Sequence, residues 1–318
     1  MSAAPEISVV LPTFNRFEIL RQAIVSVVAQ THTDWELIVA DDGSAADARA
    51  ALEETLRGLG DPRINVLGRA HSGNPGAVRT PAIARARGRY VAFIDSDDLW
   101  EPRKLETQMA LMRARPERRW SYTRLYVTDT EGRPIRGAPI ERWYPHEGWI
   151  VEPVLRQQAM IATPCVLAER TLLQQAGGFD EDQRYGEDYE LWLRMAKLSP
   201  VSVTSDALTC VRKHAGNYSR DRVGSQRGWV RFYDRAAAAA TDASLRALCL
   251  RLRGESALAL ADAQRDAGDA AAALQTLLDG AATSWRRPRW WLGALRVAVK
   301  PLVPATVRAA YRQARKPA

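Results

Sequence analysis

The N-terminal part of the chain alternates between short apolar runs and longer segments with helical spacing. The runs are rich in β-branched and aromatic residues, as buried strands are, and segments of good helix formers follow them. We predict strands at residues 7–11, 35–40, 64–67 and 90–94. This alternation favours a mostly parallel, Rossmann-like α/β sheet flanked by helices on both faces, with right-handed connections.

The pattern is less regular in the middle of the chain. Further strands are predicted at residues 120–128, 164–168, 201–203 and 208–212. Between Glu131 and Gln158, four prolines and several aromatic residues favour an ordered loop over regular structure. A loop of this length often shapes a binding site.

Beyond Val223, alanine-rich segments with helical character predominate. Residues 258–278 have a helical pattern that Gly268 interrupts, as in a single helical hairpin. We therefore expect an α/β domain over residues 1–222 and a helical C-terminal region over residues 223–318.

The formal net charge of +8 is concentrated at the C-terminus. Nine of the 45 basic residues and none of the 37 acidic residues follow Asp279, which leaves the preceding chain at about −1. A nucleic-acid-binding domain would carry basic residues across a folded face, so we expect no nucleic-acid partner.

The basic tail has an amphipathic pattern. One helical side carries Trp290, Trp291, Leu292, Leu295 and Val299, and another carries Arg289, Arg296 and Lys300. Tryptophans opposite a cationic stripe are typical of a helix that lies in an anionic membrane surface. The alternative is that the apolar side packs on the preceding helices and the arginines are solvated.

The cysteines and the N-terminus bear on the compartment. Cys165, Cys210 and Cys249 have neither an even count nor metal-ligand spacing, so we expect no disulfide. The N-terminus lacks the basic and long apolar regions of a secretory signal, and no apolar run approaches the ~20 residues that cross a bilayer. We expect a cytoplasmic protein that the tail holds peripherally on the cytoplasmic face of the membrane.

Acidic residues cluster where predicted strands end. Asp95, Asp97 and Asp98 directly follow the fourth strand, and Asp42 follows the second. In open α/β sheets, ligands bind beyond the carboxyl ends of the strands. Two carboxylates with substrate phosphates are a usual partial shell for Mg²⁺ or Mn²⁺. The alternative is that Asp97 or Asp98 caps the helix that begins near Pro102.

Six separated motifs occur in order along the chain. They are VVLPTFNR at residues 9–16, VADDGS at 39–44, Arg79 ahead of ARGRY at 86–90, DSD at 95–97, GGFD at 177–180 and GED at 186–188. Together they resemble the family 2 inverting glycosyltransferases of the GT-A fold. The resemblance covers about residues 6–219.

The resemblance implies a nucleotide site near the first strands. Asp42 matches the carboxylate that accepts the N–H of uracil or thymine, and Pro12 and Thr13 would form the adjacent wall. Arg79 is similar in position to the arginine that contacts ribose or diphosphate, where a planar multi-donor cation suits phosphate oxygens. In isolation, Asp42 equally fits an Asx-turn at a strand exit, and Arg79 a solvated helix arginine.

The resemblance also implies a metal pair and a catalytic base. Asp95 and Asp97 match the pair that holds Mg²⁺ or Mn²⁺ on the sugar-nucleotide diphosphate, and His214 would be a metal ligand or a donor to phosphate. Asp188 matches the general base and Glu187 would orient the site. The alternatives are a surface histidine and carboxylates that favour a helix N-terminus. No comparable argument applies to His32, His71 and His146.

The implied activity is inverting, metal-dependent transfer of a sugar from a UDP- or dTDP-linked donor to a glycan or lipid-linked acceptor in bacterial-type cell-surface polysaccharide synthesis. Direct displacement needs a proton acceptor on one side of the sugar and leaving-group stabilisation on the other. The alternative is a catalytically silent sugar-nucleotide-binding or scaffold protein of the same fold. A signalling receiver would need a lysine at the end of a late strand, and a nucleotidyltransferase a glycine-rich basic loop after the first strand; neither fits.

Overall fold

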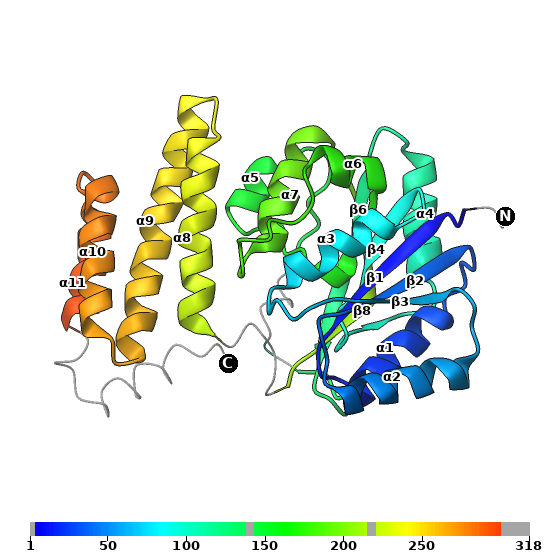
Figure 1. Cartoon of the computed structure of the whole chain (residues 1–318). Helices are drawn as coiled ribbons and strands as arrows, with labels where there is room; N and C mark the ends of the chain where they lie inside the picture. Colours follow the sequence, from blue (N-terminus) through cyan, green and yellow to red (C-terminus); the bar gives the residue numbers. More distant parts are fainter. Residues whose placement is uncertain (1–3, 136, 138–142, 215–220, 300–318) are drawn as a thin grey trace. The chain divides into compact units, whose positions relative to one another are not determined.

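The computed structural model describes residues 4–135, 137, 143–214 and 221–299 (Figure 1). The chain divides into two compact units, residues 1–217 and 218–318. This boundary lies a few residues before the one expected at residue 222.

The first unit is built on a mixed sheet that has eight strands within the described residues. The strands are β1 (Ile7–Thr13), β2 (Trp35–Asp41), β3 (Ile64–Gly68), β4 (Tyr90–Phe93), β5 (Leu99–Trp100), β6 (Trp120–Thr128), β7 (Val166–Glu169) and β8 (Val201–Arg212). Their order across the sheet is β3-β2-β1-β4-β7-β6-β8-β5. The pairings among β1, β2, β3 and β4 are parallel, as is β6 with β8, while β7 is antiparallel to both of its neighbours.

Helices pack on both faces of this sheet. They are α1 (Glu18–Val28), α2 (Ala46–Leu59), α3 (Pro75–Arg85), α4 (Lys104–Ala114), α5 (Val151–Leu155), α6 (Arg170–Gln175) and α7 (Glu187–Leu198). Because side chains alternate along a strand, β4 serves two cores. Ala92 packs in the cluster formed with α1, α2 and α4, whereas the ring of Phe93 meets Trp192 of α7 at a centroid distance of 6.2 Å.

The middle of the chain contains more regular secondary structure than the sequence predicts. The segment 131–158, expected to lack regular structure, contains α5 and two isolated bridges, Thr128 with Pro134 and Gly148 with Val201. The two predicted late strands are one strand, β8, whose pairing with β6 shifts register near Arg124. The short strand β5 was not predicted, because two residues carry no periodic signal.

The second unit is helical throughout its described residues. It contains α8 (Arg222–Ala238), α9 (Ala243–Asp266), α10 (Ala270–Ser284) and α11 (Pro288–Val299). Asp221, Asp242 and Asp269 cap the first three of these helices through their side chains. The expected hairpin around Gly268 is the turn between α9 and α10. No helix in the described part of the chain is long and apolar enough to cross a membrane.

The apolar residues of α11 lie on two faces of the helix and not on the single side that was predicted. Trp290 was expected beside Trp291 on one exposed side, but it is buried and its indole N–H donates to the carbonyl of Gly254 at 2.9 Å. Trp291, Leu292 and Leu295 remain exposed. The helix therefore has one apolar face in the core of the unit and a second in solvent; Lys300 lies outside the described residues.

Candidate active site

Asp42 lies at the end of β2, where its carboxylate faces the loop before α3. Oδ1 accepts hydrogen bonds from the backbone N–H and the hydroxyl of Ser72, at 3.0 and 2.9 Å, and Oδ2 accepts from the N–H of Gly73 at 2.9 Å. Asp42 does not form the Asx-turn that was its alternative assignment; the side chain that bonds locally at this strand exit is Asp41, which accepts from the N–H of Ser44 at 3.1 Å. The carboxylate of Asp42 is thus free of that local role.

Pro12 and Thr13 end the neighbouring strand β1. The carbonyl of Thr13 accepts a hydrogen bond from the N–H of Asp42 at 2.9 Å, which holds the two strand ends together. Thr13 is buried, and within the described structure its hydroxyl has no hydrogen-bond partner. Unsatisfied buried hydroxyls are rare in folded proteins, and a ligand or water is a common explanation. Pro12 is half-buried beside it.

Arg79 projects from α3 into the protein. Its guanidinium lies 2.5 Å from Asp95 Oδ1 and 3.2 Å from Glu187 Oε1, and it sits over the ring of Phe179. Burial acts to lower the pKa of Arg79, but the charges of Asp95 and Glu187 outweigh it and raise that pKa above its ordinary value. The alternative of a solvated helix arginine is excluded.

Asp97 lies in the turn after β4, with two basic groups on one oxygen. Oδ2 is 2.5 Å from the guanidinium of Arg16 and 2.9 Å from Nε2 of His214. Although burial acts to raise the pKa of Asp97, Arg16 and the bond with His214 lower it. His214 is therefore not a lone surface residue. Asp95, by contrast, points to Arg79 rather than to this pair.

Asp98 neither caps the following helix nor faces solvent. Its buried carboxylate accepts a hydrogen bond from the backbone N–H of Arg212 at 3.1 Å, while Arg103 occupies the cap position of α4. Burial, followed by the charges of Asp97 and Asp95, raises its pKa well above the ordinary value. Asp98 therefore joins the turn after β4 to the end of β8.

Glu187 and Asp188 form the first turn of α7, after Gly186 in the left-handed conformation. Asp188 accepts a hydrogen bond from the N–H of Tyr189 at 2.8 Å. Burial raises the pKa of Asp188, and burial together with the charge of Asp188 raises the pKa of Glu187 to about 8. Both residues thus lie at a helix N-terminus, as the alternative interpretation required, and also beside Arg79.

Whether these residues suit a divalent cation can be judged from their donor chemistry. Asp97 Oδ2 and His214 Nε2 lie within hydrogen-bond distance of each other, and Asp95 supplies a second carboxylate two residues before Asp97. In the described part of the chain no three acidic, histidine or cysteine groups converge on one point. Because Mg²⁺ usually takes one or two carboxylates plus phosphates and water, this donor set fits a cation that is completed by a diphosphate.

Three residues of this region carry no role in the sequence-based assignment. Arg16 was part of a quoted motif, Arg212 lies in β8 and bonds to the carbonyl of Asp97, and His71 was set aside. His71 stacks on Phe14 and lies next to Asp42. Only the glycine and asparagine content of the loop around His71 marked it in the sequence as able to approach a strand end.

The chain is similar in sequence to known glycosyltransferases. Residues 8–153 match the family described as Glycosyl transferase family 2. An uncharacterised glycosyltransferase of Rickettsia conorii is 34% identical over 214 residues, which make up 66% of this chain and 33% of that protein. The Escherichia coli protein UDP-Glc:alpha-D-GlcNAc-diphosphoundecaprenol beta-1,3-glucosyltransferase WfgD is 29% identical over 64% of this chain and 75% of its own length. The chain spans about a third of the length of the first curated relatives it matches.

Solved structures share the fold at lower sequence identity. TarS of S. aureus has a TM-score of 0.63 at 17% identity, over 92% of this chain and 54% of its own. The mannosyltransferase PcManGT of Pyrobaculum calidifontis, solved with GDP-Man and Mn²⁺, has a TM-score of 0.60 at 18% identity, over 95% of this chain and 88% of its own. The family match shows that residues 8–153 form a glycosyl transferase family 2 domain, and the solved structures show that the chain has a GT-A-type fold.

Proposed function

We propose that this protein is an inverting, metal-dependent glycosyltransferase that uses a UDP- or dTDP-linked sugar in cell-surface polysaccharide synthesis. The acceptor would be a glycan or a lipid-linked saccharide. One observation carries the proposal: Arg79 joins Asp95, at the end of β4, to Glu187, beside Asp188. Arg79 thereby links Asp95, a candidate ligand of the metal on the donor diphosphate, to the pair of carboxyl groups proposed to act on the acceptor.

Asp188 is the candidate general base. A positioned carboxylate that removes the acceptor proton typically accelerates transfer by ~10²–10⁴-fold. Two adjacent buried carboxyl groups cannot both ionise without cost. The raised pKa of Asp188 makes it a stronger base than an exposed aspartate, and Arg79 offsets part of the cost of ionising the pair through its ion pair with Glu187.

The donor would lie along the strand ends. Asp42, Pro12 and Thr13 would face the base, and Arg79 and Asp95 the ribose and diphosphate. Asp97 and His214, with Asp95 as a further candidate, would hold Mg²⁺ or Mn²⁺, which when bound offsets negative charge on the departing diphosphate. PcManGT was solved with GDP-Man and Mn²⁺, which supports a nucleotide-sugar donor and a divalent cation for the present chain. WfgD is named for a UDP-linked donor, which supports uridine as the nucleoside.

Asp188→Asn tests the assignment of the base. The substitution keeps the size of the side chain and its place at the start of α7, but removes its basicity. We expect transfer to fall by at least ~10²-fold while the Kd for the nucleotide changes little. The measurement is transfer and donor hydrolysis across UDP-, dTDP- and GDP-sugars with Mn²⁺ or Mg²⁺, beside calorimetric nucleotide binding. Wild-type turnover in the variant would reject the role of Asp188, and binding without turnover in the wild type would favour a silent scaffold.

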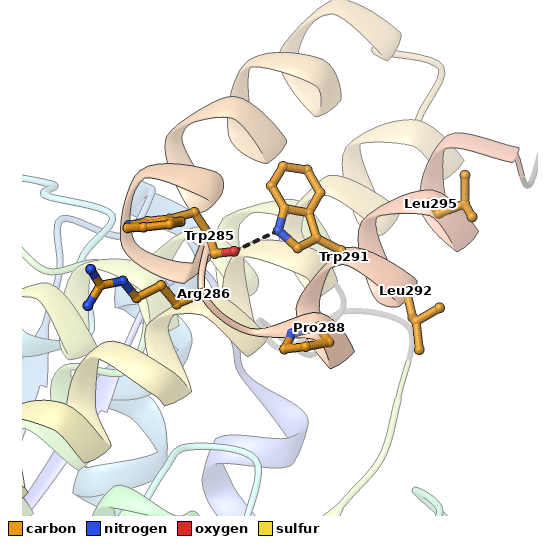
Figure 2. Close-up of a pocket in the computed structure, with 6 residues that line it drawn as sticks. All are labelled: Trp285, Arg286, Pro288, Trp291, Leu292 and Leu295. Atoms are coloured by element: carbon orange, nitrogen blue, oxygen red, sulfur yellow. Dashed lines mark hydrogen bonds between the residues drawn. The ribbon is translucent and has the colours of Figure 1, made fainter.

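We further propose that the exposed face of α11 docks on an anionic membrane surface, which would place the protein peripherally on the cytoplasmic face. A largely apolar pocket of about 570 Å³ is lined by Trp285, Arg286, Pro288, Trp291, Leu292 and Leu295. Figure 2 shows these six side chains. Leu292 and Leu295 are 68% and 61% exposed. The sequence after Asp279 is basic without an acidic residue, which complements anionic lipid headgroups.

Leu292→Ser with Leu295→Ser tests this docking without disturbing the core, because both side chains are exposed. Sedimentation with vesicles that contain an anionic phospholipid should fall by at least about tenfold. Leu274→Ser is the matched control, since Leu274 is an exposed leucine of α10 outside the pocket. Equal sedimentation of the wild type, the double variant and the control would count against the membrane assignment.

A further inference from the structure

His71 occupies a position that a planar ligand ring would suit. Its imidazole stacks on the ring of Phe14, with centroids 4.0 Å apart and an interplanar angle of 20°. Phe14 directly follows β1, and both side chains are partly exposed to solvent. The stacked pair therefore lies at the surface beside the strand ends, where it can separate without opening the hydrophobic core.

The same imidazole is directed at Asp42. Its Nδ1 lies 3.0 Å from Asp42 Oδ2 and 3.0 Å from the carbonyl oxygen of Asp42. Ser72 and Gly73 of the same loop donate their backbone N–H groups to that carboxylate. The ring of Phe14 and the carboxylate of Asp42 thus hold the imidazole of His71, a flat nitrogen heterocycle that is part of the protein itself.

The backbone around His71 fits closely against Gly43. This glycine has φ of +76°, and a Cβ there would lie 2.7 Å from the backbone N of His71. Only glycine combines that conformation with so close an approach. The backbone of the loop is therefore seated on the end of β2, whereas the His71 side chain is held by its ring contact with Phe14 and by the contacts of Nδ1 with Asp42.

We infer that the imidazole of His71 occupies the place of the nucleotide base, and that the base binds by displacing it. The inference rests on the proposed function, in which Asp42 accepts the base N–H. A uracil or thymine ring would replace both contacts, because it can stack on Phe14 and direct an N–H at Asp42. Cytosine has a lone pair in place of that N–H, so it would not replace the polar contact.

A side chain that occupies a ligand's site raises the apparent Kd of that ligand, because part of the binding free energy goes into displacing the side chain. Removing the imidazole should therefore tighten binding of a uridine nucleotide. From the typical strengths of an aromatic pair and a hydrogen bond to a charged group, we expect His71→Ala to lower the Kd of UDP by roughly 3- to 30-fold. Phe14→Ala should raise the Kd instead, because it removes the surface on which the base stacks.

Calorimetric titration of the full chain with UDP and with CDP, in metal-free buffer, tests these effects. His32→Ala is the matched control, because His32 pairs with Glu6 at the other end of β1. The expected result is tighter UDP binding in His71→Ala, weaker binding in Phe14→Ala, no change in His32→Ala, and weak CDP binding throughout. A Kd for UDP in His71→Ala that equals or exceeds the wild-type value overturns the inference while the proposed function stands.

Proton NMR supplies an independent measurement. The ring protons of His71, identified by their loss in His71→Ala, should be shifted upfield by the Phe14 ring in the free protein. Saturation with UDP should abolish this shift. A shift that persists at saturation overturns the inference, whereas absence of UDP and dTDP binding in every variant refutes the proposed function itself.

Discussion

At the scale of single residues, Arg79 has the widest reach in the site. Its planar guanidinium bonds to Asp95 and to Glu187, which lies 108 positions further along the chain. Five donors in a fixed fork hold two carboxylates in one geometry, whereas the three rotatable donors of a lysine ammonium impose no fixed geometry. The relative position of the metal-side and base-side carboxylates therefore depends on the shape of this side chain as well as on its charge.

Arg79→Lys separates shape from charge. We expect the rate of sugar transfer to fall by about 10–100-fold, because the positive charge is retained but one of the two carboxylates loses its partner. The change would be measured by steady-state kinetics with whichever of the UDP-, dTDP- and GDP-sugars proves to be the donor. Arg85→Lys, at an exposed position of the same helix, is the control and should have no effect. Unchanged kinetics in Arg79→Lys would show that charge alone is sufficient.

At the scale of elements, α4 contains a lysine on its buried face. Lys104 is fully buried, its Nζ lies 3.7 Å from the centroid of the Trp100 ring, and within the described structure that nitrogen has no hydrogen-bond partner. Burial lowers the pKa of Lys104 to about 7. The other buried residues of this face are apolar, such as Leu105 and Met109, or hydrogen-bonded, as Gln108 is, so Lys104 is buried at an uncompensated cost.

Replacing Lys104 with methionine should stabilise the protein in a pH-dependent manner. Between pH 7 and about 10 the unfolded chain binds the proton that the folded protein has lost, so wild-type stability rises with pH in this interval. At pH 7 and below, the cost of the buried amine is largest. Lys104→Met should raise the free energy of unfolding by about 2–4 kcal/mol at pH 7 and by less at pH 10.

Urea denaturation at the two pH values would measure this difference. Lys197→Met, at an exposed lysine of α7, is the control and should change stability by less than about 0.5 kcal/mol at either pH. An equal gain at pH 7 and pH 10, or a loss of stability, would contradict the assignment of a depressed pKa to Lys104.

At the scale of the whole molecule, the two units have separate hydrophobic clusters. One is formed by β1, β2 and β4 with α1, α2 and α4, and the other by α9, α10 and α11 around Trp290. In the second cluster Gly280 faces the Trp290 ring so closely that a Cβ would lie 2.8 Å from it. A substitution at this glycine should therefore weaken one unit and spare the other.

Gly280→Ala should lower the stability of the C-terminal unit by about 1–3 kcal/mol, because the overlap with Trp290 outweighs the gain in helix propensity. Calorimetry should resolve two unfolding transitions, of which only one shifts. Gly58→Ala in α2 is the matched control: nothing lies within 4 Å of a Cβ there, so it should stabilise the first unit slightly. A single transition that moves equally in both variants would contradict independent units.

Much of the fold follows from local signals in the sequence. The runs that became β1, β2 and β4 were recognisable because a buried strand needs a continuous apolar stretch, and the following helices because good helix formers follow those runs. The acidic strand ends were recognisable because Asp42, Asp95 and Asp97 stand directly after such stretches. These features depend only on neighbours along the chain.

The tertiary structure decided which side chains meet. Asp42, which the sequence assigns to the nucleotide base, is contacted by the loop that carries His71; Asp97 is shared by Arg16 and His214. Trp290 and Trp291 are adjacent in sequence, yet one is buried and the other exposed. Each outcome depends on residues distant in sequence, because a side chain's partner is set by the packing of whole elements and leaves no periodic trace in the chain.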